Sequence, residues 1–380
     1  MNLDLTEEQL LLQKTVREFA ETEVRPLAKE LDETGRWPRE LFRKAAELGL
    51  TGVAFPESEG GAGFDHIAYT IVIEEISRCC ASTGVILSVQ NSLFCDPIHR
   101  FGTAEQKKKF LLPFTRGEKI GCYALTEPQA GSNAAALQTK AVRKGDSYVL
   151  NGTKAWITNG GVADAAIVYV NTDPAKGEKG ITAIVVEKGT PGFRIGKEEK
   201  KMGIHATACC ELIFTDCEVP VANRIGNEGE GYKVALSTLD GGRIGIAAQA
   251  TGIAQGAFEA ALKYAQERLA FGHPIAQFQA IQFMLADMAT EIDAARLLVR
   301  KAAWKQDTGG RFSQEASTAK LFASEMATRV AHKAIQIHGG YGYSSEYPVE
   351  RAYRDARITE IYEGTSEIQR LVIAAWVLKP

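Results

Sequence analysis

The feature that most constrains the fold of this chain is a change in the spacing of its apolar residues, which occurs twice. Residues up to about 118 carry apolar side chains at helical spacing. From Gly121 the pattern alternates with period 2, in runs such as AIVYVNT and GITAIVVEK, and after Gly231 it is helical again. We therefore predict a multidomain α+β protein: an N-terminal α-helical domain (1–119), a middle β-domain of barrel or sandwich type (120–225) and a C-terminal four-helix bundle (226–380).

Capping signals mark where several of the helices are expected to begin. Thr6 and Gln9 form a capping-box pattern at the start of the first helix, and Ser366 with Gln369 forms a second at the start of the last. Gly-Gly pairs are expected to end two long C-terminal helices. Small residues dominate GRIGIAAQATGIAQGAFEAALKYA, a composition typical of helices that pack closely inside a bundle.

Residues 148–158 have the sequence pattern of a β-hairpin. Two β-rich runs flank the dipeptide Asn151-Gly152, which is typical of a two-residue hairpin turn. The stretch 226–231, GNEGEG, follows no βαβ pattern and differs from G-x-G-x-x-G, so we interpret it as a linker and not as a dinucleotide-binding fingerprint.

The composition argues against several classes of function. The 380 residues carry 44 basic and 47 acidic side chains without a basic stripe, so nucleic acid is not expected as a partner. Seven cysteines without C-x-x-C spacing indicate reduced, mostly buried thiols, and the six histidines lack metal-ligand spacing, so no metal is expected. The N-terminal residues lack a signal-peptide pattern and no apolar run reaches membrane-spanning length. We expect a cytoplasmic protein, or a matrix protein without its transit peptide.

Two residues are candidates for chemistry, and each also has an ordinary structural interpretation. Glu363 lies in EIYEGTSEIQR, in a loop where Gly364 permits the close approach of a ligand, yet most glutamates with these features are solvated surface residues. Trp156 lies in AWIT, which follows the turn-rich stretch YALTEPQAGS whose hydroxyls and amides suit a cofactor. A tryptophan on a strand is nevertheless more often part of a core.

Five motifs, CYALTEPQAGS, NGTKAWITN, ERLAFGHPI, IQIHGGYGY and YRDARITEIYEGTSEIQR, together resemble the acyl-CoA dehydrogenase family along essentially the whole chain. The resemblance implies the same three-domain architecture, FAD as cofactor, and a homotetramer built as a dimer of dimers. In the β-domain it implies FAD contacts from Tyr123, Leu125, Thr126, Ser132, Trp156, Ile157 and Thr158, with the tryptophan covering the isoalloxazine ring. It further implies contacts from Arg268, Phe271 and Gln279 to the FAD of a neighbouring subunit, and from Gln336, Gly339, Gly340, Thr365 and Glu367 around the phosphates and adenosine.

The resemblance also implies a reaction, the α,β-dehydrogenation of an acyl-CoA to a trans-2-enoyl-CoA. Glu363 would remove the α-proton while flavin N5 accepts the β-hydride, and the Glu363 N–H with a ribityl hydroxyl of FAD would polarise the thioester carbonyl. Expulsion of water by the substrate would raise the pKa of Glu363. The positions implied to bind substrate are Ser132, Asp240, Arg243 and Gly364.

Three further positions bear on the subfamily. Isovaleryl-type and long-chain members carry their base at the place of Gly242, so Gly242 together with Glu363 disfavours those subfamilies. The segment TGVILSVQNSLFCDPIHRFG resembles the short-chain and short-branched-chain enzymes, which favours a butyryl-like substrate. Asn133 stands where many members have an aspartate, and this difference concerns a local contact near the β-domain.

The expected electron acceptor is electron-transferring flavoprotein. Two alternatives stay open: the use of oxygen, as in acyl-CoA oxidases, and a family-like protein that has lost catalysis and serves as an assembly or binding subunit. The length of 380 residues favours the dehydrogenase over the common eukaryotic oxidases, which carry an extra C-terminal domain.

Overall fold

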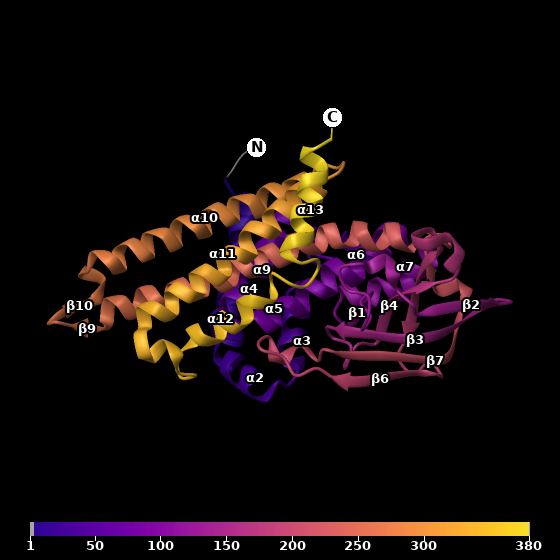
Figure 1. The fold of residues 1–380 in the computed structure, drawn as a ribbon, viewed down its shortest axis with the longest axis horizontal. Coiled ribbons are helices and arrows are strands. Elements are labelled where there is room, and N and C mark those ends of the chain that lie inside the picture. Colours follow the sequence, from indigo (N-terminus) through magenta and orange to yellow (C-terminus); the bar gives the residue numbers. More distant parts are fainter. Residues whose placement is uncertain (1–3, 380) are drawn as a thin grey trace.

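The computed structural model describes residues 4–379 and contains an N-terminal helical domain, a middle sheet domain and a C-terminal helical domain (Figure 1). The predicted N-terminal domain includes residues 1–3 and the predicted C-terminal domain includes residue 380, and these four residues lie outside the described part of the chain. The N-terminal elements are α1 (Glu7–Phe19), η1 (Ala20–Val24), η2 (Arg25–Leu27), α2 (Ala28–Thr34), α3 (Arg39–Glu47), η3 (Glu57–Glu59), α4 (His66–Cys79), α5 (Ala81–Ser88), η4 (Val89–Cys95), α6 (Asp96–Phe101), α7 (Ala104–Phe110) and α8 (Leu112–Thr115).

The sheet domain and the C-terminal domain follow in the order that the sequence predicts. The sheet domain contains β1 (Gly121–Ala124), η5 (Ala134–Ala136), β2 (Lys140–Lys144), β3 (Ser147–Ile157), β4 (Ala165–Asn171), η6 (Pro174–Gly180), β5 (Ile181–Glu187), β6 (Phe193–Glu198), η7 (His205–Thr207), β7 (Cys210–Pro220), η8 (Val221–Asn223) and β8 (Arg224–Ile225). The C-terminal domain contains α9 (Gly231–Glu267), β9 (Leu269–Ala270), β10 (His273–Pro274), η9 (Ile275–Gln277), α10 (Gln279–Asp307), α11 (Ser313–His338), η10 (Gly339–Tyr343), α12 (Pro348–Ile358) and α13 (Ser366–Val377).

The sheet is mixed, and both of its faces are buried at its centre. Its strand order is β6-β7-β3-β2-β4-β5-β8, and β1 adds to it as a parallel partner of β4. Along β4, Ile167 and Tyr169 belong to a core shared with the helical domains, whereas Val168 and Val170 belong to a second core on the other face. The period of 2 in the sequence therefore divides the side chains of this strand between two cores.

Glycines in α9 allow this helix to lie directly against α4. A Cβ added at Gly252 would lie 2.3 Å from the Glu74 carbonyl oxygen, and one added at Gly256 would lie 2.3 Å from that of Arg78. Side chains at these positions would push the two helices apart, because such distances are far below van der Waals contact. The close packing predicted from the small residues of this segment is confirmed.

The predicted hairpin turn at Asn151-Gly152 is wrong. Residues 147–157 form one continuous strand, β3, and the tight turn lies earlier, at Gly145 between β2 and β3. Gly152 sits instead at a shift of register between β3 and β7, and a Cβ there would lie 2.5 Å from Thr139 Oγ1. The glycine is explained by a β-bulge and a close approach, which leave the same sequence signal as a hairpin turn.

One of the two predicted capping boxes is present. Thr6 and Gln9 form the reciprocal hydrogen bonds of a capping box at the start of α1. The second prediction is wrong, because Thr365 is the N-cap of α13 and Ser366 is already helical. The side chain of Gln369 is therefore free to contact the loop that precedes the helix, which places it in the site described below.

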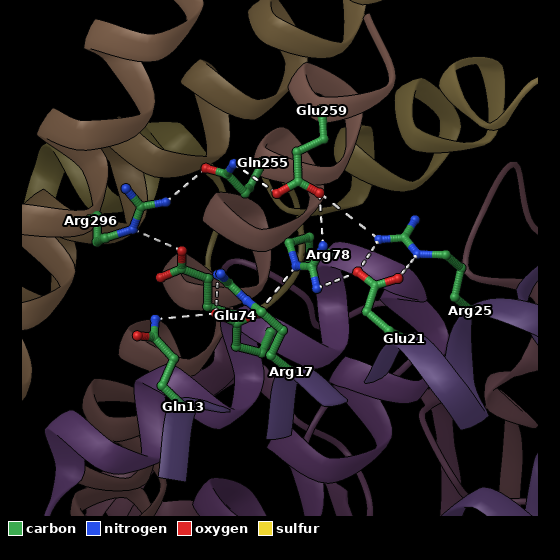
Figure 2. Close-up of polar contacts among 10 residues, drawn as sticks. Gln13, Arg17, Glu21, Arg25, Glu74, Arg78, Gln255, Glu259 and Arg296 are labelled. Atoms are coloured by element: carbon green, nitrogen blue, oxygen red, sulfur yellow. Dashed lines mark hydrogen bonds and ion pairs between the residues drawn. The ribbon is translucent and has the colours of Figure 1, made fainter. Parts of the chain in front are cut away.

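A network of charged residues around the buried Arg78 and Glu75 joins the N-terminal helices to α9 and α10 (Figure 2). At its centre Arg78 is 5% exposed and lies 3.1 Å from Glu75, 2.8 Å from Glu259 and 2.6 Å from Glu21. Glu75 also pairs with Arg17 at 2.7 Å. Because the pairs connect α1, η1, α4 and α9, they fix the N-terminal helices relative to the long helix that lies beneath the candidate site.

Two other sequence expectations meet the structure here. All seven cysteines are buried and unpaired, as the spacing predicts. Among residues 4–379, the structure contains no helix that is both long enough and apolar enough to cross a membrane.

Candidate active site

Glu363 lies in the loop between α12 and α13, and its carboxylate lies beside Gly242 in the first third of α9. Its backbone is in the left-handed region, with φ +53°, and Gly364 follows with φ +96°. A non-glycine residue with such a φ is strained by roughly 1–2 kcal/mol, so surrounding contacts must hold it in place. The strain marks this loop as a place where position is fixed for a reason other than stability.

Two buried side chains hold this loop from below. Lys320 Nζ, on α11, donates to the Gly364 carbonyl at 2.5 Å. Gln369 Nε2, on α13, donates to the same carbonyl at 2.8 Å and to the Glu363 carbonyl at 3.3 Å. Both side chains are fully buried, and Thr365 caps the helix that follows. The backbone on both sides of the glutamate is therefore anchored.

The Glu363 carboxylate points toward α9, into a space left by the absence of a side chain at Gly242. A Cβ added at Gly242 would lie 2.1 Å from Glu363 Oε2 and 2.8 Å from Leu93 Cδ2. Glu363 as a whole is half-buried, but Oε2 is sealed from solvent and has no hydrogen-bond partner. The interpretation of Glu363 as a solvated surface residue is therefore wrong.

Burial raises the pKa of Glu363 from its ordinary value of 4.5 to about 7, because the charged form loses its hydration. The positive charges of Lys320 and Arg243 oppose this rise. A carboxyl group with a pKa near neutrality can exchange a proton at physiological pH, which is the property of a general base.

Asp240 and Arg243 lie on α9 on either side of Gly242. Arg243 Nη1 donates to Asp240 Oδ1 at 2.7 Å and to Ser317 Oγ at 3.4 Å, and Ser313 donates to Asp240 Oδ2 at 2.5 Å. Arg243 is 5% exposed and is therefore not a solvated helix-surface residue. The ion pair joins α9 to α11 directly beside Glu363.

The second group of candidate residues lies at the end of the sheet domain. Trp156 is 57% exposed with φ +61°, so it is not a core residue. The backbone N–H of Ala155 donates to the Thr126 carbonyl at 2.9 Å, which joins the loop after β1 to the strand that carries the tryptophan. The structure thus brings together the two β-domain segments that sequence analysis assigns to FAD: Tyr123, Leu125, Thr126 and Ser132 on one side, and Trp156, Ile157 and Thr158 on the other.

A fully buried ion pair supports this arrangement. Lys154 Nζ lies 2.7 Å from Glu127 Oε1 and also donates to the Leu125 carbonyl at 3.0 Å. Glu127 in turn accepts hydrogen bonds from the backbone N–H groups of Gln138 and Thr139. The pair closes the loop between β1 and β2 onto β3, two residues before Trp156.

The remaining candidates are distributed over the C-terminal domain. Arg268, Phe271 and Gln279 are exposed around the β9–β10 hairpin, at the end of the molecule opposite the sheet domain (Figure 1). One chain therefore does not bring them to Trp156, as expected for residues that serve a neighbouring subunit. The exposed residues Gln336, Gly339 and Gly340 lie at the end of α11, whereas Thr365 and Glu367 lie at the start of α13, next to Gly364.

Sequence analysis missed Lys320, Gln369 and the Lys154–Glu127 pair as parts of the site. A signal for Lys320 was available, because helical spacing places it on the same buried face of α11 as Ala316 and Ala323. A lysine on a face of alanines is unusual, since lysine is almost never fully buried without a partner.

The comparisons agree with this architecture. Three family models match: "Acyl-CoA dehydrogenase, N-terminal domain" (residues 6–118), "Acyl-CoA dehydrogenase, middle domain" (122–217) and "Acyl-CoA dehydrogenase, C-terminal domain" (229–378). The short-chain specific acyl-CoA dehydrogenase of Clostridium acetobutylicum is 52% identical over 379 residues, which cover 100% of both chains. These matches show that the chain belongs to the acyl-CoA dehydrogenase family.

Solved structures extend the likeness to three dimensions. Butyryl-CoA dehydrogenase from Megasphaera elsdenii is 48% identical with a TM-score of 0.98, over 100% of both chains. A chain in the structure described as "Electron transferring flavoprotein of Acidaminococcus fermentans: Towards a mechanism of flavin-based electron bifurcation" is 50% identical with a TM-score of 0.99, also over 100% of both chains.

As a member of this family the protein is an FAD-dependent oxidoreductase. The residues present fit the cofactor in two respects. Trp156 offers an exposed aromatic face to a planar ring, and open space surrounds the backbone of Gly131, Gly339 and Gly340 where a Cβ would project. At the loop that carries Glu363, which we call the base-bearing loop from the proposal onward, Ser366 Oγ and Gln369 Oε1 are buried without partners, which is the pattern of a site whose hydrogen bonds a bound molecule completes.

Proposed function

We propose that this protein catalyses the α,β-dehydrogenation of a short-chain acyl-CoA to the trans-2-enoyl-CoA, with Glu363 as the base. The observation that carries the proposal is the sealed Oε2 of Glu363, which lies against Gly242, has no hydrogen-bond partner and belongs to a carboxyl with a pKa of about 7. A carboxylate in this state lacks the hydrogen bonds that would compete with a substrate proton.

In this proposal Glu363 Oε2 takes the α-proton of the thioester, and the carboxyl group holds that proton out of contact with water. FAD, when bound, supplies the acceptor for the hydride that leaves the β-carbon. The fixed loop backbone directs the Glu363 N–H at the thioester oxygen, which stabilises the negative charge that develops there. Arg243 and Lys320 keep Glu363 ionised before the proton is taken, since both carry positive charge close to it.

We assign the acyl-CoA to the space between α9, the base-bearing loop and the sheet domain. We assign to its lining Asp240, Arg243 and Gly364 from the C-terminal domain and Ser132 from the loop after β1. The β-domain segments around Trp156 hold the flavin, and Arg268, Phe271 and Gln279 complete the site of a neighbouring subunit. This division of residues makes a homotetramer, a dimer of dimers, the proposed assembly.

We propose a short acyl chain because side chains packed against α9 close the space beside Glu363. Leu93 lies against the same point of α9, and a Cβ at Gly245 would lie 2.4 Å from Tyr69 Oη and 2.5 Å from Ser88 Oγ. A cavity of about 20 Å³ lies nearby, lined in part by Tyr69 and Gly241. That volume holds about one water molecule and no methylene chain, which supports a butyryl-like substrate.

We propose electron-transferring flavoprotein as the acceptor and the cytoplasm as the location. Support comes from the family and from the likeness to a chain solved in a study of an electron-transferring flavoprotein. An oxidase would instead reduce oxygen directly, so air alone would restore the oxidised flavin within each turnover. A non-catalytic subunit would bind acyl-CoA without any change in the flavin.

The test is an anaerobic absorbance titration of the purified protein with butyryl-CoA, followed at the oxidised flavin band. We expect the band to bleach in the wild type and to persist in Glu363→Gln, which removes the base but keeps the shape of the side chain. Hexanoyl-CoA and octanoyl-CoA, run in parallel, should bleach the flavin progressively more slowly. An unbleached flavin with every chain length would refute the dehydrogenation, and rapid reoxidation by air without flavoprotein would favour the oxidase.

A further inference from the structure

A polar stripe runs along the face of α11 that is buried in the bundle. It comprises Ser313, Ser317 and Lys320, which follow one another at helical spacing. The two serines contact the Asp240–Arg243 pair, and Lys320 contacts the base-bearing loop. Ser324 continues the same face and the other buried neighbours include Ala316, Ala319 and Ala323, so Lys320 is the one side chain of this buried face, among the described residues, that carries a charge.

Lys320 is the charged member of this stripe, and its charge has no direct counter-ion. Its side chain is 0% exposed, and its one hydrogen bond goes to the Gly364 carbonyl, which is neutral. No carboxylate among residues 4–379 forms an ion pair with it. A buried ammonium without a counter-ion is costly, because the bound carbonyl replaces only part of the lost hydration. The cost indicates that the charge serves the site and not the stability of the helix.

The groups that face Glu363 distinguish the two nearby cations. From α9 comes Arg243, whose charge is already paired with Asp240 at 2.7 Å. From α11 comes Lys320. Three phenols also face Glu363, those of Tyr69 on α4, Tyr123 on β1 and Tyr362 in the loop itself. They are neutral because burial raises their pKa values. Glu360 and Glu367 flank the loop and act on Lys320 in the same direction as Glu363. Lys320 is thus the largest favourable charge that the base meets.

We propose that Lys320 is a positioning residue for the base: its ammonium fixes the Gly364 carbonyl, and with it the strained loop, while its charge keeps the Glu363 carboxylate ionised. This inference rests on the proposed function, since it assigns Lys320 a role toward the base named there. Burial lowers the pKa of Lys320 to about 8, so the ammonium is still charged at the pH near 7 where Glu363 titrates.

The experiment compares Lys320→Met, Lys320→Gln and Lys320→Arg with the wild type. The methionine removes both the charge and the hydrogen bond, the glutamine keeps a donor of similar length without charge, and the arginine restores the charge. Lys333→Met is the matched control: Lys333 lies on the same helix but pairs with Asp287 and Glu291 on α10 instead of contacting the loop of Glu363.

Two readouts are recorded against pH from 5.5 to 9.5, in steps of about half a unit, a range that brackets the pKa values near 7 and 8. The first is the rate of flavin bleaching by limiting butyryl-CoA. The second is the infrared C=O band of the protonated Glu363 carboxyl, identified by its absence in Glu363→Gln, which needs no substrate.

In Lys320→Met and Lys320→Gln we expect both titrations to move to higher pH by about one unit, the size of effect that one nearby charge has on a carboxyl. Bleaching near pH 6 should then be about tenfold slower than in the wild type, with the rates converging above pH 8. Lys320→Arg should restore the wild-type titration and Lys333→Met should leave it unmoved. A purely structural role would instead lower flavin content or thermal stability without moving either titration, and that result would overturn the proposal.

The two proposals fail separately. If butyryl-CoA and longer thioesters do not bleach the wild-type flavin, the proposed reaction falls, and the infrared titration still decides whether Lys320 controls Glu363. If the wild type is bleached but the titrations of Lys320→Gln and the wild type coincide, the role of Lys320 falls and the reaction stands.

Discussion

Replacing the proposed base should make the protein more stable at alkaline pH. The pKa of Glu363 rises from 4.5 to about 7 in the folded protein, so folding favours the protonated carboxyl. Its contribution to stability is therefore complete below pH 4.5 and is lost as the pH rises through 7. At pH 9 the folded protein pays for an ionised carboxylate held without a hydrogen bond. A shift of about 2.5 units corresponds to roughly 3 kcal/mol, which Glu363→Gln should recover.

The assay is thermal unfolding of Glu363→Gln and the wild type at pH 5 and pH 9, with flavin-loaded protein in both cases. For domains of this size, 3 kcal/mol corresponds to a rise in Tm of roughly 6–12 °C, and we expect it at pH 9 with little difference at pH 5. Glu360→Gln is the control, because it makes the same carboxyl-to-amide change in the same loop, at a side chain that pairs with Arg357. Equal Tm values for Glu363→Gln and the wild type at both pH values would refute the claim that this carboxylate is buried at a cost.

Two further predictions follow from neighbouring contacts. Gly242→Ala places a Cβ where Glu363 Oε2 now lies, so flavin reduction by butyryl-CoA should slow by about 100-fold, whereas Gly241→Ala, whose Cβ would meet only Gln306 Nε2 at 3.5 Å, should be close to wild type. Normal rates in Gly242→Ala would exclude the observed position of the carboxylate. Lys154→Met leaves Glu127 buried without its partner and should lower the free energy of unfolding by about 3–5 kcal/mol, which loss of flavin and a lower Tm would register. Gly242→Ala disturbs the Glu363 carboxylate and should act mainly on the rate, whereas Lys154→Met disturbs the loop between β1 and β2 and should act mainly on Tm and flavin content.

The order of helices and strands could be predicted because each is a local property of the sequence. Thr6 and Gln9 cap α1 as expected, and β4 alternates between two cores. The errors arose where one local signal serves two structures. Gly152 is required by a bulge and not by a hairpin turn, and Thr365, one residue earlier than expected, caps α13. Local patterns do not tell these pairs apart, because the deciding contacts come from distant segments.

Only some residues of the candidate site could be predicted from the sequence, and the reason is physical. Glu363 and Trp156 lie in motifs that resemble those of a known family, so their importance could be read without a structure. The surroundings that give Glu363 its chemistry come from α9, α11 and the segment around Leu93, which meet only in three dimensions. A pKa depends on the summed effect of such neighbours, and no spacing along the chain encodes it.

The geometry also explains why Gly242 and Glu363 occur together. The carboxylate of Glu363 fills the space in which a side chain at position 242 would begin, since the separation from a Cβ there is 2.1 Å. The Glu363 carboxylate and a longer side chain at position 242 therefore cannot both be present in this arrangement, because they would occupy the same space. A base that approaches from α9 would meet the same point of the substrate from a helix with ordinary backbone angles. The loop position instead carries a left-handed backbone, and it tolerates that strain because Lys320 and Gln369 hold the carbonyl of the next residue. The proposed position of the base thus depends on two features together: glycine at position 242 leaves room for the carboxylate, and the buried Lys320 holds the strained loop.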